Sequence, residues 1–168
     1  MSLHKPARAL RAPPALLWLS IVGSLLLQVT LPAIFSLAKL FAFPLLVTIY
    51  FSVARQDKVF GIFLGTGLGL LQDALSHSYL GLMGMAGALV GYLAASASTK
   101  FDLDNSLARG SLIAGLLILQ DLVTAFLRHV LLSAPYPFEA LRWASSASVN
   151  VAIGLILFHF FDRFRQSA

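Results

Sequence analysis

Long apolar segments recur along the whole chain, and they constrain its fold more than any other feature. Hydrophobic residues make up 58% of the 168 residues and charged residues only 11%, with a mean hydropathy of +0.84. A water-soluble core of this size cannot bury so much apolar surface, so a bilayer must cover most of it. We predict an all-α integral membrane protein whose single domain is a compact bundle of six transmembrane helices.

The first span follows the Pro13-Pro14 pair and is expected to end at Pro32. The predicted spans are residues 15–31, 40–54, 59–76, 79–98, 107–132 and 140–161.

The distribution of Lys and Arg predicts how these helices are oriented, because basic residues concentrate on the cytoplasmic side of a membrane. The ambiguous region is 59–98, since a helix over 59–73 would be about 22 Å long against an apolar core of roughly 30 Å. Six spans place nine of the twelve basic residues and both termini in the cytoplasm, whereas five spans give seven against five. We therefore predict six spans, with the third short, tilted or broken near Asp73. The nine cytoplasmic residues are Lys5, Arg8, Arg11, Arg55, Lys58, Lys100, Arg109, Arg163 and Arg165.

Several classes of function are disfavoured by the residues that the chain lacks or scatters. It has no cysteine, which excludes disulfides, thiol catalysis and cysteine metal sites. Its basic residues lie at the ends of apolar segments, where they match phospholipid and not nucleic acid. No span carries a nucleophile-elbow pattern, paired metal-binding histidines or two neighbouring carboxylates. We expect no enzyme activity, no metal and no cofactor.

Glycines form a regular stripe through the middle of the sequence. In lipid, small residues let two helix backbones approach closely, which supplies packing that the hydrophobic effect cannot. The stripe therefore predicts close packing against another helix of the same chain or, alternatively, against the helix of a partner protein. Its members are Gly61, Gly65 and Gly69 on the third helix, and Gly81, Gly84, Gly87 and Gly91 on the fourth.

Asp73 comes at the expected external end of the third helix, directly after Gln72. The simpler interpretation is that Asp73 caps the following turn, accepting hydrogen bonds from Ser76 or from nearby backbone amides. A ligand-binding or proton-relay role is the alternative. His77 is expected to be a loop residue at the membrane interface.

Asp121 lies near the middle of the fifth helix, where an unpaired charge costs at least about 3 kcal/mol. Asn150 is predicted at a similar depth on the antiparallel sixth helix, and Arg128 follows Asp121 by two turns. We predict that Asp121 faces the bundle interior and bonds Asn150, Gln120 or Arg128. The alternative is a proton or cation path, which would need further acidic groups at connected depths.

A motif in the central region resembles the signature of a known family. The motif, here called the Gly-Asp-Ser-Gly motif, comprises Gly69, Asp73, Ser76 and Gly81, and the sequence Gly91-Tyr92-Leu follows it. With the chain length, the basic N-terminus and the close succession of spans, it resembles MreD, the small multispanning subunit of the bacterial cell-elongation machinery.

The resemblance implies a non-enzymatic scaffold in the bacterial cytoplasmic (inner) membrane. Such a scaffold would bind MreC, a bitopic periplasmic protein, and through it help to organise a class B penicillin-binding transpeptidase, the RodA glycosyltransferase and MreB filaments in peptidoglycan synthesis. The resemblance further implies that Asp73, Ser76 and Gly81 form a structural or partner-contact motif. Membrane lipid is an expected partner, and the sequence leaves the formation of a homodimer as an open alternative.

The alternative from a different class is the substrate-binding subunit of an energy-coupling vitamin transporter, which has a similar size and number of spans. Those subunits tend to carry an AxxxA surface on their first helix, where this chain has only Ser20 and Ser24 at that spacing. A vitamin pocket also needs convergent polar and aromatic groups, and the predicted external loop offers only Tyr136, Phe138 and Glu139. The polar residues thus favour the scaffold, although the two classes can share an architecture.

Overall fold

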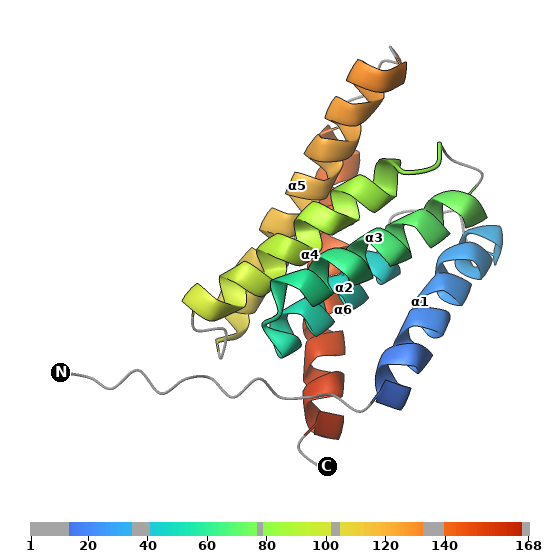
Figure 1. Cartoon of the computed structure of the whole chain (residues 1–168). Coiled ribbons are helices and arrows are strands. Elements are labelled where there is room, and N and C mark those ends of the chain that lie inside the picture. Colours follow the sequence, from blue (N-terminus) through green and yellow to red (C-terminus); the bar gives the residue numbers. More distant parts are fainter. Residues whose placement is uncertain (1–13, 35–40, 77–78, 102–104, 133–139, 166–168) are drawn as a thin grey trace.

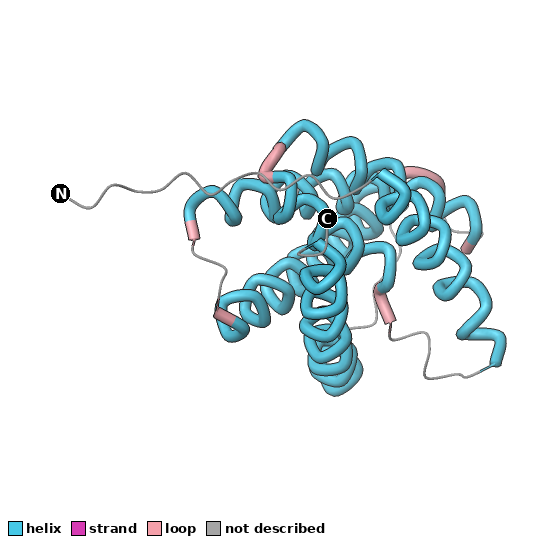
Figure 2. The backbone as a smooth tube through the Cα atoms, turned by 90° about the horizontal axis from the view of Figure 1, so that it is seen from below, coloured by secondary structure: helices cyan, strands magenta, loops and turns pink. Residues whose placement is uncertain are grey.

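A computed structural model describes residues 14–34, 41–76, 79–101, 105–132 and 140–165, apart from the side chains of residues 33, 140–144 and 164–165. The described residues contain helices and no strand, as the backbone traces show (Figures 1 and 2). In chain order the helices are α1 (Pro14–Ile34), α2 (Phe43–Arg55), α3 (Lys58–Leu75), α4 (Leu82–Lys100), α5 (Ser106–Leu132) and α6 (Ala140–Arg165).

The predicted all-helical membrane fold is confirmed, because five of these helices are long and apolar enough to cross a bilayer. The orientation of the helices stays a prediction, and Lys5, Arg8 and Arg11 lie outside the described residues. One predicted detail is wrong. Pro32 lies inside α1, which ends at Ile34, because a proline so near a helix end removes only one hydrogen bond. Of the three alternatives for the third span, the break near Asp73 does not occur, because α3 runs without interruption from Lys58 to Leu75.

The shortest helix, α2, forms the centre of the bundle. Ten of its 13 residues are buried, and Phe51 is completely covered. The ring of Tyr50 packs on two rings of α6, with centroid separations of 5.0 Å to Phe158 and 4.8 Å to Phe161. At 1.5 Å per residue α2 is about 20 Å long, against an apolar core of roughly 30 Å. A full crossing by the predicted span 40–54 would therefore need residues beyond α2 itself.

Helices α3 and α4 form an antiparallel hairpin in backbone contact, and they lie side by side in Figure 1. A Cβ atom added at Gly65 would overlap the carbonyl group of Gly87, and one added at Gly87 would overlap that of Gly65. Gly61 and Gly91 form the same reciprocal contact one turn away. The pairs advance by four residues along one helix and retreat by four along the other. These four glycines of the stripe thus pack against each other within the chain.

This packing predicts opposite effects of adding one methyl group at two neighbouring glycines of α3. Gly65→Ala should lose roughly 1–3 kcal/mol of stability, because the backbones of α3 and α4 must separate. Gly67 is the matched control, since a Cβ there would meet nothing within 4 Å. Gly67→Ala should be neutral or gain up to about 1 kcal/mol from helix propensity. Thermal unfolding of the purified variants in detergent measures both, and equal stability would contradict the close approach.

Candidate functional site

Asp73, near the end of α3, is completely buried and caps the start of α4. Its Oδ2 atom accepts hydrogen bonds from the backbone N–H groups of Gly81, at 2.9 Å, and Met83, at 3.0 Å. The first N–H groups of a helix have no partner within it, and a carboxylate there also matches the positive end of the helix dipole. Asp73 therefore satisfies backbone donors of α4 from a different helix. Its Oδ1 atom is buried and accepts no hydrogen bond from the described residues.

The other residues of the Gly-Asp-Ser-Gly motif shape the same turn. Gly81 has a φ of +102°, the left-handed conformation that side chains disfavour, and it begins α4. Ser76 ends α3, where its backbone N–H donates to the carbonyl oxygen of Gln72 at 2.9 Å and its side chain is exposed. His77 lies outside the described residues. Ser76 does not donate to Asp73, whose Oδ2 atom accepts from backbone N–H groups at the start of α4 instead.

Gly69 completes the motif from one helical turn before Asp73. A Cβ atom at Gly69 would overlap the carbonyl group of Met83, whose N–H group donates to Asp73. The absence of a side chain at Gly69 and the carboxylate of Asp73 thus both act on the first turn of α4. The spacing of Gly69, Asp73 and Gly81 has a structural explanation: these three residues fix the tip of the α3–α4 hairpin.

Asn150 on α6 performs a similar task for α2. It is completely buried, and its Oδ1 atom accepts a hydrogen bond of 2.8 Å from the backbone N–H of Ala42, directly before α2. Its Nδ2 atom donates to the backbone oxygen of Ser146 at 2.9 Å and to the Ser146 hydroxyl at 3.2 Å. Asn150 therefore joins α6 to the start of the central helix.

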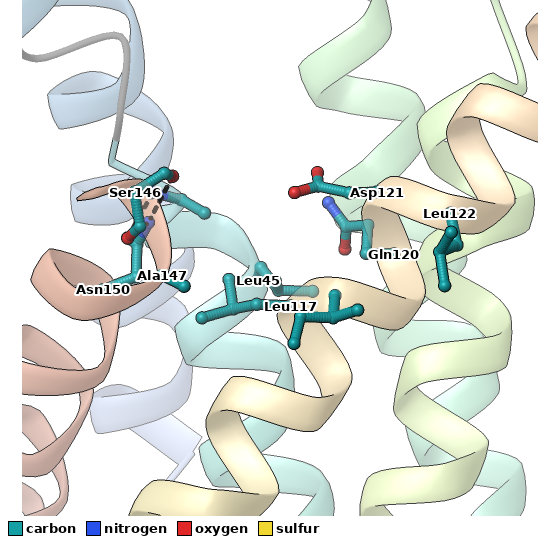
Figure 3. Close-up of a pocket in the computed structure, with 10 residues that line it drawn as sticks. Leu45, Leu117, Gln120, Asp121, Leu122, Ser146, Ala147 and Asn150 are labelled. Atoms are coloured by element: carbon teal, nitrogen blue, oxygen red, sulfur yellow. Dashed lines mark hydrogen bonds between the residues drawn. The ribbon is translucent and has the colours of Figure 1, made fainter. Parts of the chain in front are cut away.

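Asp121 does not form the pairs that the sequence predicts for it. No hydrogen bond or ion pair joins its carboxylate to Asn150, Gln120 or Arg128 in the described part of the chain. The Asn150 amide is committed to Ala42 and Ser146 instead. Asp121 and Asn150 do face a common cavity between α5 and α6, as Figure 3 shows.

A polar cluster that the sequence analysis missed joins α2, α5 and α6. The guanidinium of Arg109 forms an ion pair of 2.7 Å with Asp162, and the Tyr50 hydroxyl donates to the same carboxylate at 3.4 Å. Arg109 also lies 5.6 Å from the ring centre of Phe158. The two residues of the ion pair are 53 positions apart in the sequence, so no local sequence pattern predicts their contact. The one available signal was a single Asp among the aromatic residues at the end of the last apolar segment.

The described residues contain no group of three or more His, Asp or Glu side chains that could hold a metal ion. The loop residues Tyr136, Phe138 and Glu139 lie outside the described part of the chain. The contacts on α2, α3, α4 and α6 thus perform structural tasks, namely capping, helix approach and ion pairing. None of these structural tasks explains the cavity at Asp121.

Comparison with known proteins identifies the family. The family described as rod shape-determining protein MreD matches residues 11–167, nearly the whole chain. The chain belongs to the MreD family. Its role is therefore in determining rod shape, and its apolar helices make it a membrane protein. Searches of the curated proteins and of the solved structures found no match.

The cap at Asp73 predicts how variants of this family's motif behave. Asp73→Leu should lose about 1–3 kcal/mol of stability, because two partly buried N–H groups at the start of α4 would lose their acceptor. Asp73→Asn should lose less, since an amide oxygen still accepts a hydrogen bond. The control is Ser76→Ala, whose exposed side chain should make it near neutral. Thermal unfolding compares the three, and an Asp73→Leu protein as stable as Ser76→Ala would refute the cap.

The Arg109–Asp162 pair predicts a measurable coupling energy. A double-mutant cycle of Arg109→Gln and Asp162→Asn should give about 0.5–1 kcal/mol of interaction, because both side chains are only partly exposed. Ser111→Ala combined with Asp162→Asn is the control cycle. Its effects should add, since the Ser111 hydroxyl bonds only its own helix, at Ala108. Additive effects in the first cycle would show that the ion pair contributes nothing.

Proposed function

We propose that this protein is a non-enzymatic scaffold of the bacterial rod complex in the cytoplasmic membrane. The scaffold binds MreC, and through MreC it helps to organise a class B penicillin-binding transpeptidase, RodA and MreB during peptidoglycan synthesis. The observation that carries the proposal is the match to the MreD family over residues 11–167. The same match gives the vitamin-transporter alternative no support.

The distribution of polar groups is consistent with this proposal. Asp73, Asn150 and the pair Arg109–Asp162 are engaged in contacts between helices of the chain. A protein built in this way acts on partners mainly through the outer faces of its helices.

Helix α1 is the least buried of the long helices, and it lies at the edge of the bundle in Figure 1. Most of its large apolar side chains point away from the other helices, including Trp18, at 65% exposure, and Leu19, at 73%. Within the proposal, this face is the contact for the membrane-spanning helix of MreC. Homodimerisation through the same face is the competing use of that surface.

Affinity purification of the tagged full-length protein from gently solubilised native membranes tests the proposal. Mass spectrometry should identify MreC together with cell-wall synthases. Trp18→Ala combined with Leu26→Ala should reduce the recovery of MreC several-fold, because both side chains belong to the exposed face of α1. Leu107→Ala is the control, since Leu107 is 80% exposed but lies on α5.

Recovery of a transmembrane coupling subunit with paired ATPases would overturn the scaffold and identify a transporter subunit. Normal recovery of MreC by the α1 variant would leave the scaffold standing but move the contact to another helix. Self-association of the tagged and untagged protein, lost in the same variant, would assign the α1 face to a homodimer.

A further inference from the structure

A cavity of about 420 Å³ lies between α2, α5 and α6. Its walls are mostly apolar, and Leu45, Leu117 and Ala147 contribute to them (Figure 3). The polar groups gather at one end, where Gln120 and Asp121 of α5 face Ser146 and Asn150 of α6. A volume of this size lies within the ordinary range for pockets that bind small molecules.

At the polar end of the cavity, hydrogen-bond acceptors are available to a ligand, whereas the donors are engaged within the protein. Asp121 forms no hydrogen bond with the described residues, so its carboxylate is available to a ligand. The Gln120 amide nitrogen lies 3.8 Å from the Met83 sulfur, which leaves the carbonyl oxygen of Gln120 for another contact. The Asn150 amide already donates to Ser146. A ligand that matches this end must therefore donate hydrogen bonds and favour a negative neighbour.

The rim of the cavity indicates how such a ligand would enter. Ile118 and Leu122 line the cavity and are also exposed on the outer face of α5, at 47% and 52%. In a membrane that face meets lipid, so the cavity is reached sideways by molecules dissolved in the bilayer. An unpaired carboxylate at this depth costs at least about 3 kcal/mol, which a cationic ligand would offset.

We propose that this cavity binds an amphiphile with a protonated primary amine, whose N–H groups donate to Asp121 and whose apolar body lies along Leu117 and Ala147. The amine can belong to an aminophospholipid headgroup or to a smaller hydrophobic amine, because both present the same chemistry to the carboxylate. The site is separate from the proposed α1 face and does not depend on the scaffold function.

Native mass spectrometry of the full-length protein, released from lipid nanodiscs, tests the proposal. The probes are phosphatidylethanolamine, phosphatidylcholine and octylamine. Phosphatidylcholine carries a quaternary ammonium without N–H donors, so retention of phosphatidylethanolamine should exceed it at least tenfold if the lipid is the source. Retention of octylamine alone would instead assign the site to a smaller amine and still support the amine chemistry. Equal retention of all three probes would overturn the proposal.

Three variants separate specific binding from unspecific effects on folding. Asp121→Asn should abolish the preference for the amine, because it keeps the shape and removes the charge. Ala147→Phe should fill the cavity and lower retention at least tenfold. Ala152→Phe is its matched control, since residue 152 is exposed on the same helix. Asp121→Asn protein that folds and retains the amine normally would contradict the proposal.

Cross-linking in native membranes distinguishes a lipid-like ligand from a protein partner. A photoreactive amino acid at Ile118, on the rim of the cavity, should capture lipid. Capture of the membrane helix of another protein at this position would show that the cleft docks a protein, and it would overturn the amine site.

Discussion

Backbone N–H groups at helix starts control the architecture of this bundle. In water these donors bond to solvent, but inside a membrane each one needs an acceptor from the protein. The acceptors come from distant helices: Asp73 of α3 for α4, and Asn150 of α6 for Ala42 at the start of α2. Gln28 of α1 adds a weaker contact of 3.3 Å to Phe43. Each cap therefore also fixes the position of one helix relative to another.

The close approach of α3 and α4 is a second requirement of the fold, and it depends on the caps at the helix starts. The reciprocal contacts between Gly61 and Gly91 and between Gly65 and Gly87 leave no room for side chains between α3 and α4. Such contacts are short-range, so a small shift along the helix axis would remove them. The cap at Asp73 fixes that register at the tip of the hairpin. Dispersion between backbones and a buried hydrogen-bonded carboxylate thus stabilise the same geometry.

Much of this fold could be predicted from the sequence, because hydropathy and spacing are local signals. The six segments, the glycine stripe and the capping interpretation of Asp73 all followed from residues close in the chain. That Asp121 forms none of its predicted pairs within the described residues could not be predicted in this way. The position of a residue along its helix predicts which residues of other helices lie at the same depth. The rotation of each helix about its axis decides which of these side chains meet, and Asn150 meets Ala42. The ion pair between Arg109 and Asp162 was not predicted, for the same reason. The N-cap at Asp57, whose Oδ1 atom accepts from Val59 and Phe60, was local but hidden in a basic loop.

The dependence of α2 on Asn150 has a consequence for biosynthesis. Residue 42 leaves the ribosome more than a hundred positions before residue 150, so α2 exists for some time without its cap. During that interval a short central helix lacks both the acceptor for Ala42 and the aromatic cover of Phe158 and Phe161. Helix α6, which is synthesised after α2, thus completes the core around it. A chain released before α6 would present an unfinished centre to the quality-control proteases of the membrane.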